Sequence, residues 1–140
     1  MNPTVNSPRK QVVEVEEEVI HQLMVVRIHG FVPAEAGKIV WNEVLDKVIR
    51  TGSNKLLIDA KDSKVIPIET QQWFRDYYFP SLERRLPKGR RLRVARVQPE
   101  DIFSVIQSEQ LDKQLDQLQS VIEFQVFQTA KQARQWLLGE

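Results

Sequence analysis

The sequence predicts a single α/β domain with a five-stranded mixed sheet, mostly parallel, and helices mainly on one face. Short apolar stretches of strand character alternate with long segments of helical period, the pattern of strands joined by crossover helices. Each predicted strand also has one polar-rich side, whereas a sheet covered on both faces has continuously apolar strands. Because crossovers are right-handed, strands in consecutive order would place their helices on the same face.

The first two predicted strands, residues 11–18 and 20–29, form a hairpin. Val13 and Val15 alternate with glutamates, which is the period of a half-buried strand. The glutamates favour an edge position, where charge discourages unwanted pairing.

The clearest helix spans residues 34–51, where apolar side chains recur at helical spacing. Pro33 suits its start and Gly52 suits the position after its end. The strand that follows, residues 55–61, has an apolar run at residues 56–58 and is predicted to be the interior strand.

Residues 68–86 are helical in pattern, but Pro80 interrupts them. Proline lacks an amide hydrogen and disfavours helix at the preceding residue. We therefore expect a kink, or two helices with Pro80 in the first turn of the second. A strand at residues 90–97 follows a Pro-Lys-Gly turn.

Residues 99–120 are predicted to form a helix in two pieces. The expected core side chains are Ile102, Val105 and Ile106 in the first piece and Leu111, Leu115 and Leu118 in the second. A last strand at residues 122–127 alternates cleanly between apolar and polar side chains. Thr129 and Gln132 have capping-box spacing for the final helix, whose expected buried side is Ala133, Trp136 and Leu137.

The composition fits one soluble domain of 140 residues, with 41% hydrophobic and 28% charged side chains. No apolar run reaches the roughly 20 residues that cross a bilayer, and residues 1–10 lack an apolar signal core. We therefore expect a flexible N-terminal tail over residues 1–10 and a cytoplasmic protein without an integral membrane segment. The sequence has no cysteine and no metal-ligand spacing, and its net charge is +1. We expect no metal, no cofactor and no nucleic-acid partner.

Several short segments together resemble a known fold. They are residues 30–32, 57–59, 73–74, 78–80, 93–95, 99–103, 124–127 and 133–137. In this order the chain resembles the STAS fold of the sporulation anti-sigma factor antagonists, whose relatives include CRAL-TRIO lipid-binding domains. It looks more closely like a group of small bacterial STAS-like proteins of uncharacterised function. The resemblance implies that residues 11–139 form one STAS-like domain acting as a non-enzymatic interaction module.

The chain departs from the antagonists at one place. They carry a phosphorylatable serine at a helix start after the third strand, where this chain reads Ile-Pro-Ile-Glu-Thr at residues 66–70. Thr70 is the only hydroxyl nearby. We interpret it as an ordinary residue of the first helical turn, with phosphorylation as the less favoured alternative.

An aromatic cluster is the most distinctive candidate site. It consists of Trp73, Phe74, Tyr77, Tyr78 and Phe79. Consecutive helical residues are about 100° apart, so these rings cannot all face one core stripe. Either they pack under the linker and a kinked helix, or some of them line an apolar ligand pocket or a partner groove.

Two further groups of residues have a functional and a structural interpretation. Asp59 and Lys61 end the middle strand, where open parallel sheets bind ligands; alternatively, Asp59 accepts loop amides. A basic run could bind phosphates, but we favour a solvated turn and strand face. The run consists of Arg84, Arg85, Lys88, Arg90, Arg91, Arg93 and Arg96.

The first functional hypothesis is presentation of the loop and helix around residues 70–79 to a protein partner. The second is a small-molecule or lipid-binding domain with the aromatic cluster as its pocket wall. A homodimer is also considered, because Leu23, Val25 and Leu57 are predicted on the sheet face without helices and could form a self-association patch.

Overall fold

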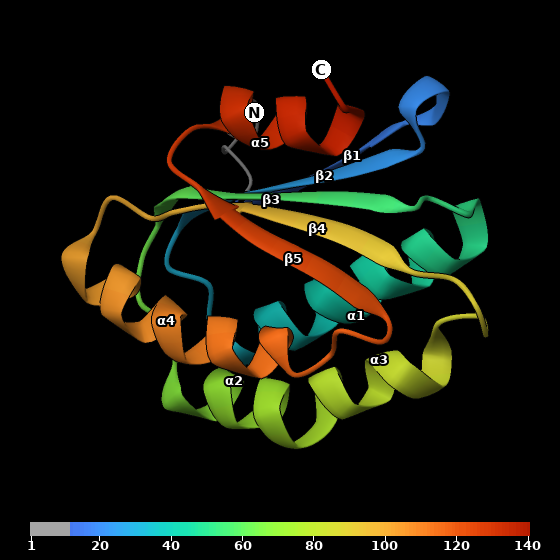
Figure 1. Ribbon diagram of the computed structural model, residues 1–140. Helices are drawn as coiled ribbons and strands as arrows, with labels where there is room; N and C mark the ends of the chain where they lie inside the picture. The colour runs from blue at the N-terminus through green and yellow to red at the C-terminus, as the bar shows by residue number, and fades with distance from the viewer. Residues whose placement is uncertain (1–11) are drawn as a thin grey trace, which may run out of the picture.

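The computed structural model describes residues 12–140 and contains one sheet with the strand order β1-β2-β3-β4-β5 (Figure 1). The strands are β1 (Val13–Glu18), β2 (Leu23–Gly30), β3 (Lys55–Ser63), β4 (Leu92–Val97) and β5 (Ile122–Phe127). β1 pairs antiparallel with β2, and the other neighbours pair parallel. The predicted mixed sheet in consecutive order is confirmed. The predicted tail, residues 1–10, lies outside the described residues.

The β1–β2 hairpin closes through a short 3-10 turn, η1 (Val19–His21). Gln22 follows it with a positive φ of 53°, and its backbone N–H donates to the carbonyl of Val19 at 3.1 Å. β1 pairs only with β2 and so forms an edge of the sheet, as its glutamates predicted.

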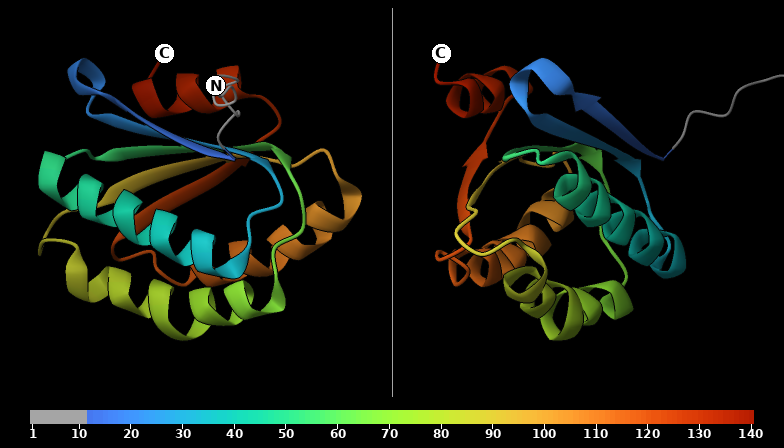
Figure 2. Two further views of the ribbon diagram at one scale, coloured as in Figure 1. Left: turned by 180° about the vertical axis from the view of Figure 1, so that it is seen from behind. Right: turned by 90° about the vertical axis from the view of Figure 1, so that its right-hand side faces the viewer.

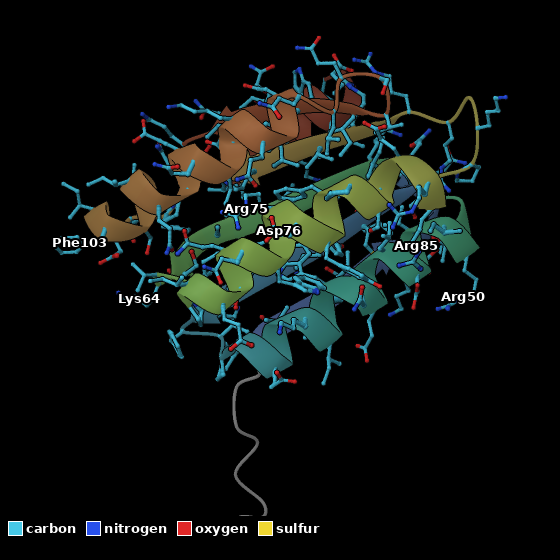
Figure 3. All side chains as sticks on the ribbon, turned by 90° about the horizontal axis from the view of Figure 1, so that it is seen from below. Arg50, Lys64, Arg75, Asp76, Arg85 and Phe103 are labelled. Carbon is cyan, nitrogen blue, oxygen red and sulfur yellow. The ribbon has the colours of Figure 1, made fainter. Side chains whose placement is uncertain are left out.

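Most helices lie on one face of the sheet, as predicted (Figures 1 and 2). They are α1 (Ala34–Thr51), α2 (Ile68–Trp73), α3 (Phe79–Arg85) and α4 (Ile102–Asp116). Within this group α1 and α4 flank the sheet, while α2 and α3 lie farther from it, between them (Figure 2, right; Figure 3). No helix within residues 12–140 is long and apolar enough to cross a membrane.

The opposite face of the sheet is covered by the last helix, α5 (Ala130–Leu138) (Figure 1). Thr129 caps this helix by accepting the N–H of Gln132 at 3.1 Å, as the capping-box spacing predicted. Leu23, Val25 and Leu57 are at most 3% exposed, packed in one cluster with Ala133 and Leu137. The predicted self-association patch is therefore wrong. The rule that crossover connections are right-handed applies to helices that join two parallel strands. No strand follows α5, so the rule does not predict which face this helix covers.

α4 is one continuous helix rather than two pieces, and its first half is oriented unexpectedly. Ile102 and Ile106, predicted to face the core, are exposed, while Ser104 and Ser108 are buried. Its second half follows the prediction, because Leu111 and Leu115 pack against the core, as does Leu118 just after the helix.

Candidate functional site

The segment from α2 to α3 is one continuous helical rod that forms the outer wall of the domain (Figure 3). Its middle is a π-helical turn, η2 (Phe74–Tyr78), in which the N–H of Phe79 donates to the carbonyl of Phe74, five residues earlier. Pro80 lies in the first turn of α3, as predicted. Because Pro80 has no amide hydrogen to donate, the widened turn just before it preserves the rod without a break.

The π turn rotates the aromatic cluster so that three rings point inward. Phe74, Tyr78 and Phe79 are each at most 9% exposed. Phe74 and Phe79 stack at 5.3 Å between ring centroids, with an interplanar angle of 11°. A regular helix would separate these two positions by about 140°, so the extra residue in the turn makes this stacking feasible. Most of the cluster therefore packs in the interior.

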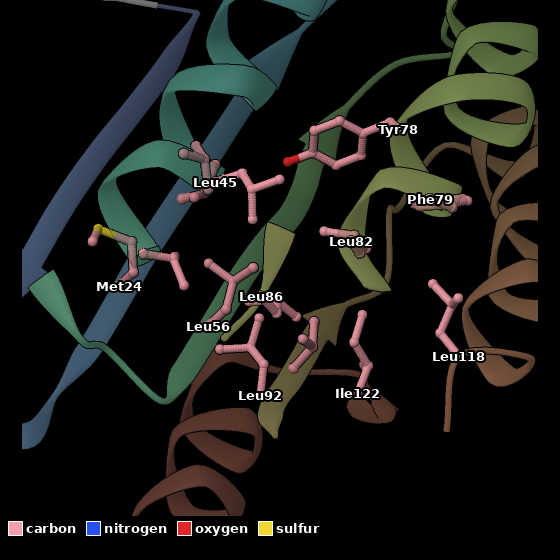
Figure 4. Close-up of a cluster of buried hydrophobic side chains, with 14 of the residues drawn as sticks. Met24, Leu45, Leu56, Tyr78, Phe79, Leu82, Leu86, Leu92, Leu118 and Ile122 are labelled. Carbon is pink, nitrogen blue, oxygen red and sulfur yellow. The ribbon is translucent and has the colours of Figure 1, made fainter. Parts of the chain in front are cut away.

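α1 holds the inner rings through Trp41. The Trp41 ring meets the edges of Phe74 and Tyr78, at 6.0 and 6.4 Å between centroids. The Tyr78 hydroxyl donates to the backbone carbonyl of Trp41 at 2.6 Å, and it points toward α1 in Figure 4. Burial raises the pKa of Tyr78 well above its ordinary value of 10, so this hydroxyl remains a donor.

The other two rings of the cluster lie toward the surface. Tyr77 is 59% exposed, and it stacks on the half-buried Trp73 at 6.3 Å between centroids. The five rings therefore do not share one face of the helix, as the sequence predicted. Three point inward and two lie toward the surface.

The inner rings line a cavity of about 160 Å³ between the rod and the sheet. Leu56, Ile58 and Val94 belong to the sheet side of its lining, and Val44 and Leu111 belong to α1 and α4. The aromatic side chains separate the rod from the sheet. The cavity remains because these rings do not fill all of the space between the rod and the sheet.

Polar side chains also line the cavity. They are Ser63, Lys64, Thr70, Arg96, Ser104, Gln107 and Ser108. Arg96, only 7% exposed, donates to both carboxylate oxygens of Asp112 on α4, at 2.9 Å for the longer contact. Burial raises the pKa of Asp112 above its ordinary value, and the hydrogen bond from Arg96 opposes that rise.

A second feature is an exposed apolar surface where the β3–α2 loop meets the start of α4. This loop–helix patch consists of Val65, Ile68, Ile102, Phe103 and Ile106, with exposed fractions from 38% to 70%. Gln107 joins its two halves, because its side chain accepts from the N–H of Ile66 at 2.7 Å and donates to the Ile66 carbonyl at 2.9 Å. Phe103 and Lys64 lie at the same end of the molecule in Figure 3.

The remaining predicted site residues lie apart from the inner rings. Asp59 follows Ile58 on β3 and so points to the opposite face, since side chains alternate along a strand. Its carboxylate accepts the backbone N–H of Lys61 at 3.2 Å, the structural role considered from the sequence. Lys61 is exposed. The geometry therefore does not bring this pair beside the rings of Phe74 and Tyr78.

Thr70 lies in the first turn of α2, beside Gly37 of α1, and is 3% exposed. Its burial agrees with a structural position, and a hydroxyl so placed is inaccessible to a kinase in this conformation.

Most arginines of the basic run have partners inside the domain. Arg85 pairs with Asp46, and Arg93 pairs with Glu123 at 3.1 Å while lying 4.0 Å from the Trp136 ring centroid. Arg90 donates to the carbonyls of Val48 and Ser53. These contacts use the arginines to join elements, in line with the structural interpretation of the run.

The architecture matches solved structures at low sequence identity. A crystal structure of an anti-sigma factor antagonist from Mycobacterium paratuberculosis superposes with a TM-score of 0.53 and 17% identity, covering 89% of this chain and 92% of that chain. An uncharacterised protein of the DUF3478 family with a SpoIIAA-like fold, from Shewanella loihica PV-4, gives a TM-score of 0.52 and 15% identity, covering 89% and 91%. No family model and no curated protein matches the sequence.

These matches define the class of fold. The chain has the STAS-like, SpoIIAA-like fold that its sequence resemblance implied.

Sequence reasoning missed the polar lining of the cavity and the loop–helix patch. The signal was present at residues 102–108, where serines at 104 and 108 share one helical face between exposed isoleucines and a phenylalanine. Hydrophobicity alone predicts that the apolar residues of this segment face the core, whereas its serines face inward.

Proposed function

We propose that this domain is a non-enzymatic regulatory module that binds a protein partner through the loop–helix patch. The observation that carries the proposal is the inverted first half of α4, which buries Ser104 and Ser108 and exposes Ile102, Phe103 and Ile106. Exposing large apolar side chains while burying hydroxyls is unfavourable for an isolated domain, and such patches mark interaction sites.

The fold gives independent support for a protein partner. An anti-sigma factor antagonist is named for its action on another protein, and this chain shares that architecture. The proposed surface includes the loop before α2 that the sequence indicated, but not the inner rings, because Phe74, Tyr78 and Phe79 are buried. Tyr77 and Trp73 remain available at the outer side of the rod.

The test compares two isoleucines with the same exposure. Ile106 in the patch and Ile39 on α1 are both 58% exposed, so Ile106→Asp and Ile39→Asp make the same change on different surfaces. Proteins captured from the source cells are identified by mass spectrometry, and each is then purified and titrated calorimetrically. We expect a direct binder whose affinity falls at least about tenfold with Ile106→Asp and is unchanged with Ile39→Asp. Equal loss with both variants, or no direct binder, would refute the proposal.

A second candidate function is binding of a small apolar molecule in the cavity between the rod and the sheet. The supporting observation is the cavity of about 160 Å³ lined by Phe74, Tyr78 and Phe79. This corresponds to the ligand-binding alternative of the sequence analysis, with the inner rings as the wall and without Asp59 and Lys61.

A further inference from the structure

The cavity is polar at one end and apolar at the other. Leu92 and Ile122, the first residues of β4 and β5, lie at the amino end of the parallel strands. Ser63 ends β3, and Arg96 is the penultimate residue of β4, so both lie toward the carboxyl end. α4 follows the same gradient, with Ser104 and Ser108 in its first half and leucines in its second.

Most polar groups at that end already have hydrogen-bond partners. Ser63 donates to the Ala60 carbonyl at 2.7 Å. Ser104 donates to Asp101 at 2.8 Å, and Ser108 donates to the Val105 carbonyl at 2.9 Å. Gln107 uses both ends of its amide on the backbone of Ile66. These groups are therefore satisfied by the fold itself.

Two lining residues carry buried polar atoms with no hydrogen-bond partner among residues 12–140. They are the Oγ1 atom of Thr70 and the Nε atom of Arg96. Thr70 is 3% exposed and Arg96 is 7% exposed, so bulk water does not readily supply the missing contacts. Buried donors without partners are rare in native proteins and call for an explanation. The Nε–H of Arg96 can only donate and the Thr70 hydroxyl can donate or accept, so a ligand with an acceptor atom could serve both.

The lining contains two cationic side chains, of which Lys64 is exposed to solvent and Arg96 is buried and paired with an acid. Arg96 donates from its two terminal nitrogens to Asp112, which leaves Nε as the guanidinium nitrogen without a hydrogen-bond partner. A carboxylate ligand would add a second negative charge beside Asp112, whereas a neutral carbonyl oxygen would accept a hydrogen bond without that cost.

The volume limits the size of the ligand. An apolar cavity of about 150 Å³ accommodates benzene, and this cavity measures about 160 Å³. We infer that it binds a small neutral carbonyl compound, with an apolar body of about one ring against the inner aromatic residues and its oxygen toward Thr70 and Arg96. This inference rests on the second candidate function and specifies its ligand class.

The experiment uses three probes of similar size that differ at one position. Acetophenone has a neutral carbonyl, α-methylstyrene replaces the oxygen with a methylene group, and benzoate carries a negative charge. Binding to the full chain is measured by calorimetry and by the displacement of side-chain methyl signals in NMR spectra. We expect acetophenone to bind about tenfold more tightly than α-methylstyrene, the effect of about one hydrogen bond, and benzoate to bind more weakly than acetophenone.

Two variants locate the binding. Thr70→Val keeps the side-chain shape and removes the hydroxyl, so it is expected to weaken acetophenone several-fold and leave α-methylstyrene unchanged. Leu111→Phe extends a lining side chain into the cavity and is expected to reduce binding of both probes. Thermal unfolding of each variant checks that it folds.

The outcomes separate the inference from the candidate function. Equal affinity of acetophenone and α-methylstyrene, both blocked by Leu111→Phe, would retain ligand binding and overturn the carbonyl assignment. Tighter binding of benzoate would overturn the neutral-ligand assignment. Absence of binding by every probe to the well-folded wild type would overturn both the inference and the second candidate function.

Discussion

The two faces of the sheet are covered in different ways. On one face α5 lies directly on the strands, and Ala95 and Ala133 are both fully buried with Leu137 at 1% exposure. On the other face large rings hold the rod of α2 and α3 away from the strands and leave a cavity. Small side chains allow a helix and a sheet to approach closely, whereas large rings between the rod and the sheet leave unfilled space. The comparison indicates that the α5 face is closely packed, whereas the opposite face contains a cavity.

Polar contacts at the edges of α5 reinforce the closely packed face. Arg93 of β4 lies over the Trp136 ring and donates to the Trp136 carbonyl at 3.1 Å. Arg134 pairs with Glu18 at the end of β1. On the cavity face, the comparable charged contact, Arg96 with Asp112, leaves the buried Nε atom of Arg96 without a hydrogen-bond partner.

The largest expected effect is the removal of Leu137. Leu137→Ala deletes a side chain with 1% exposure from the packed face, so we expect a loss of about 2–5 kcal/mol in the free energy of unfolding. Urea denaturation followed by circular dichroism measures it. The control is Leu111→Ala, because Leu111 is only partly buried and already borders the cavity; its loss should be smaller. Equal losses would contradict the contrast between the faces.

Adjacent residues on β4 test the same contrast in the opposite direction. Ala95 faces α5 and Val94 lines the cavity, so Ala95→Leu overfills a closed space and Val94→Leu extends into an open one. We expect Ala95→Leu to lower the free energy of unfolding by about 1–3 kcal/mol and Val94→Leu to change it by less than about 1 kcal/mol. Thermal and urea unfolding of both variants provide the comparison. A larger loss for Val94→Leu would show that the cavity face is as tightly packed as the other.

Much of the fold could be predicted from the sequence because local patterns determine it. The period of each strand, the helix between Pro33 and Gly52, and the Thr129 cap all follow from neighbouring residues. The place of α5 could not be predicted in this way. Its docking depends on Ala133 of α5 packing in one cluster with Ala95 of β4, which is distant in the sequence.

The site was less predictable than the fold. The aromatic residues lie on a helical segment, as their pattern predicted, but the π turn that brings Phe74 and Phe79 together depends on tertiary packing and on Pro80. Apolar residues were expected inside α4, whereas Ser104 and Ser108 occupy the buried side. Departures from local sequence rules are expected at functional sites, and the residues whose burial differs from the prediction belong to the proposed sites.

The smallest expected effect concerns the ion pair that ties α5 to the hairpin. The two oxygens of Glu18 accept from Arg134, at 2.8 Å for the longer contact. This hydrogen bonding lowers the pKa of Glu18 from 4.5 to about 2, with a smaller contribution from His21 and opposition from burial. A carboxyl whose pKa is lowered by folding stabilises the protein fully above its unfolded pKa and loses that effect as the pH falls through its folded pKa.

Glu18→Gln should therefore lower the free energy of unfolding at pH 7 by less than about 1 kcal/mol, because the pair is partly exposed and screened by solvent. The deficit should shrink as the pH falls from 4.5 toward 2, where the wild-type carboxyl also becomes neutral. The matched control is Glu17→Gln, which makes the same charge change at an exposed neighbouring position. Urea unfolding at several pH values distinguishes them. A pH-independent deficit for Glu18→Gln, or an equal one for Glu17→Gln, would mean that the pair with Arg134 does not secure α5.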